Sequence, residues 1–297
     1  MIVTELALIA PREFDRLVAH VGGRGFLEER GYDVEYLDSK IGDESAMANA
    51  IVRVVQQPPE IIVAFGDDEA VAFRRALPNV TLVFWSNSDP TTIGLADTFH
   101  RPGGFATGAT SDWAGNTKPV ELIAEVLGSA GAHGRFRVGV MSNSRWFAPA
   151  RTARWNDAAL ANGIELEDIS AETYAQLLEH PRWMAVEQYH AVILPISTPR
   201  VTHVEEIVRH LSSRKVLNLF ENFGALVKGG ALGYQAERPD WPVELGTAIR
   251  LVIEGVEPGD IPVRGPDAWT FAVNKTALAQ LGRTLTPATK ALISRVF

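Results

Sequence analysis

Two short polar loops in the first third of the chain have residue types that bind a small anion. Trp85-Ser86-Asn87-Ser88-Asp89-Pro90 follows one apolar run, and Phe65-Gly66-Asp67-Asp68 follows the run before it. Backbone N–H groups at a helix start, with hydroxyl and amide side chains, can bind a ligand carboxylate. The ligand contacts expected here are Gly66, Asp67, Trp85, Ser86, Asn87 and Asp89. The alternative is a pair of capped turns, with the aspartates as helix N-terminal charges.

A second group of polar and aromatic residues lies further along the chain. Asn143-Ser144-Arg145-Trp146 offers an amide, a hydroxyl, a cation and a large ring, a combination that suits an amphipathic ligand. Thr110-Ser111-Asp112-Trp113 lies where a first lobe would lead to a second, as hinge and cleft wall. The expected contacts are Asp112, Trp113, Asn143, Ser144, Trp146, Ser197 and Thr198. The structural alternatives are a hinge alone, a surface loop and, for Ser197-Thr198-Pro199, a helix N-cap.

Glu221 is the candidate partner for a ligand ammonium group. It directly follows the apolar run Val216–Phe220, and Asn222 stands beside it as a further contact. An amino acid would then place its carboxylate on the Ser86-Asn87 loop and its ammonium on Glu221, because each charge needs a complementary group. Asp89 and Asp112 are alternatives for the ammonium group, and Glu221 could instead be an exposed carboxylate at a helix start.

Patterns typical of catalysis or metal binding are weak in this sequence. The chain has no cysteine, and among its seven histidines His203 and His210 are two helical turns apart with no third ligand. It has no G-x-S-x-G elbow, Walker loop or H-E-x-x-H pair. Gly22-Gly23-Arg24-Gly25 resembles a dinucleotide fingerprint only faintly, because it does not directly follow the first strand. We expect no enzyme activity, no cofactor and no metal ion.

The elements that must position these loops are short apolar runs alternating with amphipathic helical stretches. Runs of Val, Ile and Leu bounded by Gly, Pro, Asn and Ser are typical of buried parallel strands. They occupy 5–10, 61–65, 81–85, 137–141, 191–196 and 216–220, with more exposed strands at 33–38 and 165–169. Strand starts recur every 20 to 28 residues or so, about the length of a strand and helix, in two sets. This spacing indicates two copies of one architecture.

The predicted fold class is α/β, with two doubly wound parallel-sheet lobes, a hinge and an interlobe cleft. Ligand loops should lie at the carboxyl ends of the strands of each sheet. The expected lobes are residues 1–113 with 234–264, and residues 114–233 with 265–297. The Gly-rich segment 227–233 and Ile261-Pro262-Val263 are interpreted as regions where the chain passes between lobes.

Three segments carry a resemblance to a known family. They are S-D-P at 88–90 followed by R-P-G-G-F-A-T-G at 101–108, V-K-G-G-A-L at 227–232, and D-I-P-V at 260–263 followed by F-A-V-N-K-T-A at 271–277. In this order they resemble ABC-transporter substrate-binding proteins associated with tryptophan and tyrosine uptake. The resemblance implies a periplasmic-binding-protein type I fold that closes around an amino acid or similar small ligand. The chain departs from the family pattern at Phe105, where the family has asparagine, and at 221–223, where the family has S-D-E.

Composition narrows the partners and the location. The net charge is -8 and no basic cluster is present, which disfavours nucleic acid and anionic membranes as partners. The N-terminus lacks the pattern of an export signal. The resemblance nevertheless implies a monomer in the periplasm or tethered to the cell surface, with an ABC permease as partner of the closed state. A cytoplasmic location stays open. A ligand-sensing domain that signals to a partner protein is the main alternative, and an α/β enzyme is a weaker one.

Overall fold

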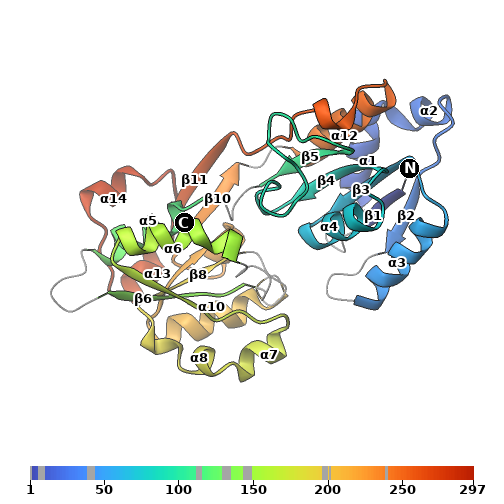
Figure 1. Cartoon of the computed structure of the whole chain (residues 1–297). Helices are drawn as coiled ribbons and strands as arrows, with labels where there is room; N and C mark the ends of the chain where they lie inside the picture. The colour runs from blue at the N-terminus through green and yellow to red at the C-terminus, as the bar shows by residue number, and fades with distance from the viewer. Residues whose placement is uncertain are drawn as a thin grey trace. The chain divides into compact units, whose positions relative to one another are not determined.

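The computed structural model describes residues 2–5, 11–38, 44–111, 116–128, 135–142, 149–195, 200, 202–237 and 240–297. The chain divides into two compact units, Met1–Asp112 with Arg238–Asp267 and Trp113–Glu237 with Ala268–Phe297. Each unit is a mainly parallel sheet with helices packed on its faces (Figure 1). The predicted class, α/β with two doubly wound sheets, is confirmed.

The passages between the units lie within a few residues of the boundaries expected from the sequence. The second passage follows Glu237 and the third follows Asp267. Strand β10 (Leu232–Glu237) continues through Gly233 and pairs along its whole length with β11 (Ala268–Val273), which keeps residues 234–237 in the second unit. Arg264 forms a parallel bridge with Ala109 of the first unit, so the chain has not yet left that unit at position 265.

The first unit has a five-stranded sheet in the order β2-β1-β3-β4-β5, in which all neighbouring strands are parallel. The strands are β1 (Ile2–Glu5), β2 (Glu35–Asp38), β3 (Ile61–Phe65), β4 (Thr81–Ser86) and β5 (Ala106–Thr110). One face packs against α1 (Pro11–Val21), α2 (Gly23–Glu28) and α12 (Trp241–Ile253). The other packs against α3 (Glu44–Gln56) and α4 (Asp67–Ala76).

Strand β3 shows why the central strands are continuous apolar runs. Ile61, Val63 and Phe65 pack on the side of α1 and α12, whereas Ile62 and Ala64 pack on the side of α3 and α4. Successive side chains of a strand point to opposite faces, so a strand covered on both faces must be apolar throughout. Burial of each large aliphatic side chain contributes roughly 1.5–3 kcal/mol.

The Gly-rich signature segment 101–108 packs against the segment around the 3-10 helix η3 (Pro258–Asp260) in the first unit. Gly103 N–H donates to the carbonyl of Gly259 over 3.2 Å. A Cβ atom on Gly259 would lie 2.8 Å from the carbonyl oxygen of Gly104, so the two backbones touch. Thr107 Oγ1 donates to the carbonyl of Ile261 over 2.8 Å. These two segments therefore pack against each other within the first unit.

The second unit repeats the strand order of the first and extends it. Its sheet runs β12-β11-β10-β9-β8-β6-β7, and among these described strands only the β10–β11 pair is antiparallel. The strands before β10 are β6 (Phe136–Val140), β7 (Ile164–Asp168), β8 (Ala191–Leu194) and β9 (Leu217–Phe220), and β12 is Arg295–Val296. With β6 as the first strand, the order β7-β6-β8-β9-β10 matches β2-β1-β3-β4-β5.

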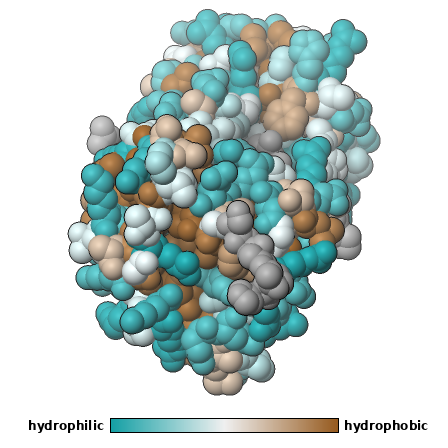
Figure 2. Space-filling view, turned by 90° about the vertical axis from the view of Figure 1, so that its left-hand side faces the viewer, coloured by the Kyte–Doolittle hydropathy of each residue, from teal (hydrophilic) through white to brown (hydrophobic). Residues whose placement is uncertain are grey.

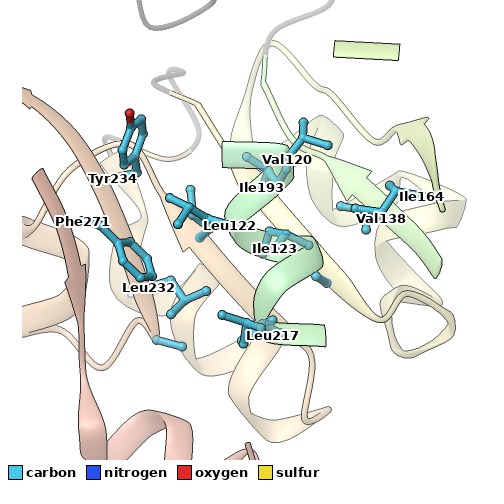
Figure 3. Packing of buried hydrophobic residues seen from close by; sticks show 14 of the residues in the cluster. Val120, Leu122, Ile123, Val138, Ile164, Ile193, Leu217, Leu232, Tyr234 and Phe271 are labelled. Carbon is cyan, nitrogen blue, oxygen red and sulfur yellow. The ribbon is translucent and has the colours of Figure 1, made fainter. Parts of the chain in front are cut away.

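Helices cover both faces of this second sheet. The main ones are α5 (Lys118–Leu127), α6 (Pro149–Ala161), α10 (Val204–Ser213) and α13 (Lys275–Gln280). Shorter helices are α7 (Tyr174–Glu179), α8 (Pro181–Met184), η2 (Val186–Gln188), α11 (Gly224–Val227) and α14 (Pro287–Ala291). Figure 3 shows Leu122 and Ile123 of α5 packed with Leu217 and Leu232 of the sheet. This core fixes the sheet edge at which the candidate residues lie.

Four strands are absent from the sequence prediction, namely β5, β10, β11 and β12. Strand β5 has the sequence ATGAT, whose small and hydroxyl residues carry no strong apolar signal. Strand β1 (Ile2–Glu5) meets the predicted strand 5–10 at Glu5, and residues 6–10 of that prediction lie outside the described residues. The segment 227–233, interpreted as a passage between lobes, is instead the turn from α11 into β10.

Candidate functional site

The candidate residues that the structure describes lie at the carboxyl ends of the strands, where doubly wound sheets bind ligands. Gly66 and Asp67 follow β3, Ser86 ends β4, and Glu221 follows β9. The remaining described candidates, Trp85, Asn87, Asp89 and Asn222, lie in or next to these segments. Seven candidates lie outside the described residues: Asp112, Trp113, Asn143, Ser144, Trp146, Ser197 and Thr198.

Asp67 occupies the position that the sequence assigns to a ligand carboxylate in the first unit. Its Oδ1 accepts hydrogen bonds from the backbone N–H of Asn87 over 2.8 Å and from that of Ser88 over 3.3 Å. Its Oδ2 accepts from the hydroxyl of Ser88. The backbone N–H of Asn87 therefore already has an acceptor, and a ligand carboxylate next to it would be repelled by the Asp67 carboxylate.

The other polar groups of this edge also close the loop on itself. The hydroxyls of Ser86 and Thr110 both donate to the carbonyl of Ser88, each over 3.0 Å. Asp89 Oδ1 accepts from the backbone N–H of Thr91 over 2.8 Å and from its hydroxyl over 2.6 Å. Such local bonds are those of a side-chain-capped turn. These hydrogen bonds are those expected if the loop 85–90 is a capped turn, which is the alternative to a ligand-binding loop.

Trp85 is a core residue of the first unit. Only 6% of its surface is exposed, and it belongs to the cluster that contains Val63, Ala109 and Ile261. Its place follows from strand alternation, because Val83 and Trp85 lie on the same face of β4. The sequence interpretation of Trp85 as a ligand-facing ring is therefore corrected. Asn87 is partly exposed, and its side-chain oxygen accepts a hydrogen bond from the hydroxyl of Ser111 over 3.3 Å.

The second unit buries two opposite charges at its carboxyl edge. Glu221 and Arg200 are each 2% exposed. The backbone N–H of Glu221 donates to the carbonyl of Leu194 over 3.2 Å, and Arg200 Nε donates to the carbonyl of Pro195 over 2.9 Å. Both residues are thus fixed to adjacent peptide groups at the end of β8. The alternative of Glu221 as an exposed helix-start carboxylate is wrong.

Arg200 is absent from the sequence-based candidates. The segment before it was interpreted mainly as an N-cap motif, which directs attention to hydroxyls and away from the cation that follows. Its signal is position in the sequence, because it comes six residues after the end of β8. A buried guanidinium costs free energy unless it has partners, so a buried arginine at a strand end is a candidate for function.

Two further polar residues occupy the same edge of the second unit. Ser142, which follows β6, is fully buried, and its hydroxyl has no hydrogen-bond partner among the described residues. Its backbone N–H donates to the hydroxyl of Ser170 over 3.0 Å. Asn222 Oδ1 accepts from the backbone N–H of Ala225 over 3.4 Å, so it holds the start of α11. Ser142 is a candidate that the sequence prediction did not include.

The two histidines weighed as metal ligands pack against aromatic rings. His203 stacks on Tyr174 with ring centroids 4.0 Å apart, and His210 stacks on Trp183 at 4.4 Å. Burial lowers the pKa of His210, since it disfavours the charged imidazole. Within the described part of the chain, no three His, Asp or Glu side chains form a group that could hold a metal ion.

Comparison with known protein families identifies the family of this chain. The family described as ABC transporter substrate binding protein matches residues 6–292. The chain belongs to this family. Its members bind a solute for a membrane permease, so the family implies a small-molecule ligand and a permease partner. The family resemblance described from the sequence is confirmed.

Solved structures show the same periplasmic-binding-protein type I fold. An ABC domain from Streptococcus pneumonia in complex with L-Trp has a TM-score of 0.76 and 20% identity, with 100% of both chains covered. A conserved domain protein from Vibrio cholerae has a TM-score of 0.77 and 19% identity, covering 100% of this chain and 99% of its own. A substrate-binding protein from Desulfitobacterium hafniense in complex with Leu has a TM-score of 0.50 and 12% identity, covering 95% and 87%.

No curated protein has a significantly similar sequence. Proteins of this family typically work outside the cytoplasm. Among the described residues, every helix is too short or too polar to cross a bilayer.

Proposed function

We propose that this protein captures an amino acid for an ABC importer and that its second unit recognises both charged ends of the ligand. The observation that carries the proposal is the pair Arg200 and Glu221, two opposite charges that are each 2% exposed at one sheet edge. Family membership supports a small-molecule ligand. The ligands of two structural relatives, L-Trp and Leu, support an amino acid.

The geometry of the two charges suits one zwitterion. Leu194 and Phe220, the last residues of β8 and β9, pair directly across the sheet. Neighbouring strands lie about 5 Å apart, which is the scale of the two ends of an amino acid with a reaching side chain at each. The planar guanidinium of Arg200 can hold a carboxylate through two parallel hydrogen bonds, and Glu221 can hold the ammonium group.

This assignment keeps the predicted role of Glu221 and moves the ligand carboxylate. Asp67 already accepts the hydrogen bonds that the sequence assigned to that carboxylate. The side chain of Asn87 stays a proposed contact of the first unit. Asp112, Trp113, Asn143, Ser144, Trp146, Ser197 and Thr198 stay proposed contacts without a described position.

Calorimetric titration with a panel of amino acids tests the function directly. We expect one class of amino acid to bind, and Glu221→Gln to cost about 2–4 kcal/mol of binding, because a charge then loses its partner in a buried site. Glu205→Gln is the matched control, since Glu205 is exposed and pairs with Lys228 in the same unit. If no amino acid binds the wild type, or if Glu221→Gln binds as tightly, the proposal fails.

Ligand analogues assign each charge to its residue. An amine that lacks the carboxylate should bind wild type and Arg200→Gln with equal affinity, whereas the amino acid should lose affinity in the variant. A carboxylic acid that lacks the ammonium should be insensitive to Glu221→Gln. Arg209→Gln on α10 is the control for loss of a cation. The reverse pattern would exchange the two roles.

We further infer that ligand binding brings the two units together, since a ligand that contacts both stabilises the closed state. The two separately compact units and the family support this. Small-angle scattering should show compaction and a monomer mass when the ligand is added. A scattering profile that does not change when the ligand binds would contradict closure.

The genes next to the native gene test the extracytoplasmic location and the import role. A permease gene and an ATPase gene are expected there. A kinase or cyclase gene would instead indicate a sensor.

A further inference from the structure

A pocket of about 320 Å³ lies within the second unit, at the amino-terminal end of α5. Its lining comes from three parts of that unit: the start of α5, the β10–β11 ribbon, and the segment after α14. None of the proposed ligand contacts lines it. The volume is at the lower end of the range for small-molecule sites, which suits one or two fused rings.

The wall of the pocket is aromatic. Tyr234 of β10 and Trp269 of β11 stack with centroids 5.1 Å apart and planes inclined by 9°. Phe271 pairs directly with Tyr234 across the two strands. Figure 3 shows Leu122 of α5 beside the rings of Tyr234 and Phe271. Tyr234, Trp269 and Phe271 thus give the pocket three aromatic side chains in its lining.

The remaining lining is apolar or internally neutralised. Leu292, which is 42% exposed, adds an apolar side, and Figure 2 shows apolar surface among polar side chains on the side of α5 and α14. Lys118 Nζ and Glu121 Oε2 form an ion pair at 2.8 Å. The hydrogen bond from Lys118 lowers the pKa of Glu121, which keeps the carboxylate charged. The lining therefore has no excess charge that would select an ion.

We propose that this pocket is a second binding site, for a small, flat, uncharged aromatic molecule with one hydrogen-bond donor. A third ring can continue the stack of Tyr234 and Trp269, and stacked rings attract beyond the area that they bury. Acceptors for the donor are at hand in Glu121 and in Ser294. The proposal does not rest on amino-acid binding at Arg200 and Glu221.

The pocket also adjoins the chain segments that lead to the other unit. Trp269 follows the third passage closely, and Tyr234 lies on the strand that leads to the second. Asn116, the first described residue after the first passage, donates from its Nδ2 to the hydroxyl of Tyr234 over 3.2 Å. A molecule stacked here would therefore contact residues that lie close in sequence to all three connections.

Equilibrium dialysis with indole tests the site, because indole is flat, uncharged and has a single N–H donor. We expect one equivalent to bind the full chain, and Trp269→Ala to weaken binding about ten-fold or more, the loss of a stacking wall and its buried area. Leu160→Ala is the control, since Leu160 is an exposed leucine of the same unit that does not line the pocket. Circular dichroism checks that Trp269→Ala is folded.

Glu221→Gln separates this site from the proposed amino-acid site. Indole should bind this variant as tightly as the wild type even when amino-acid binding is lost. If Glu221→Gln abolishes indole binding, indole occupies the amino-acid site and the second site is refuted. Absence of saturable indole binding, or equal binding to Trp269→Ala, also refutes it, whatever the outcome for amino acids.

Discussion

The two units share one strand order but differ in what stands at the carboxyl ends of their strands. In the first unit the acidic group, Asp67, accepts hydrogen bonds from the neighbouring loop. In the second unit Arg200 and Glu221 bury opposite charges beside each other's strand ends. The comparison teaches that repeated topology repeats the place of a site and not its chemistry. The polar groups at the carboxyl end of the first sheet bond to one another, whereas the carboxyl end of the second sheet buries one cation and one anion.

The segments that carry the resemblance to the family have structural roles in both units. Gly103 and Gly104 have positive φ, at 72° and 58°, and Gly103 N–H donates to the carbonyl of Gly259. Ser88 binds the Asp67 carboxylate, and Asn274 accepts from the N–H of Ala277 at the start of α13. These are turn, cap and packing roles. The segments that carry the resemblance to the family therefore have structural roles in this fold.

The largest expected effect compares the fifth strands of the two sheets, β5 and β10. An alanine Cβ at position 108 would lie 2.0 Å from the carbonyl oxygen of Phe84, a backbone atom of the neighbouring strand. At position 233 it would lie 2.8 Å from a side-chain carbon of Leu226, which can move. We expect Gly108→Ala to lower the free energy of unfolding by on the order of 4 kcal/mol, and Gly233→Ala by about 1–2 kcal/mol.

Urea unfolding, with hydrogen exchange to report each unit separately, measures both variants. The loss in Gly108→Ala should appear in the first unit and that in Gly233→Ala in the second. If the two variants lose the same free energy of unfolding, β4 and β5 can move apart as easily as the Leu226 side chain can move. The backbone contact at Gly108 would then not limit the stability of the first unit.

The next effect concerns Asp67. Asp67→Ala removes the acceptor of two backbone N–H groups and one hydroxyl, and each buried donor left without a partner costs roughly 1–3 kcal/mol. We expect a loss of about 2 kcal/mol in the stability of the first unit. Asp68→Ala is the control, because Asp68 is an exposed residue in the first turn of the same helix. A variant that keeps its stability but loses amino-acid binding would show that Asp67 itself contacts the ligand.

Strand pattern and burial explain how much the sequence could predict. The runs at 61–65 and 81–85 are buried on both faces, so local composition alone reveals them. Strand β5 escapes because small residues are required where Gly108 meets the backbone of Phe84. Edge strand β12 has only two residues, too few for any periodicity.

Predicting the site was harder, because side-chain partners are set by tertiary contacts. Glu221 follows a recognisable strand, and its position at the sheet edge was predictable. The bond between Asp67 and Asn87 joins residues far apart in sequence, and nothing in either loop indicates that one satisfies the other. Arg200 is buried and donates to the carbonyl of Pro195, and no local pattern in the sequence indicates this.

The smallest expected effect is a pH dependence confined to the second unit. Glu167 of β7 accepts from Arg137 Nε over 2.6 Å and from the Tyr189 hydroxyl over 3.0 Å. The hydrogen bond from Arg137 is the largest influence and lowers the pKa of Glu167 below its ordinary value of 4.5. Burial, with the bond to Glu167, raises the pKa of Tyr189 to about 12.

The two shifts act on opposite limbs of the stability curve. A carboxyl whose pKa is lowered on folding stabilises the protein above its unfolded pKa, so this contribution is lost as the pH falls below about 4.5. A phenol whose pKa is raised stays protonated in the folded state while the unfolded state ionises, so stability falls between pH 10 and about 12. Glu167→Gln should flatten the acid limb, and Tyr189→Phe the alkaline limb, in urea unfolding followed by hydrogen exchange of the second unit. Because Arg137 and Glu167 are partly solvated, the change in Glu167→Gln should be smaller than that in Asp67→Ala. If either variant alters the first unit instead, the two sheets do not unfold independently, and differences between their edges cannot be measured one at a time.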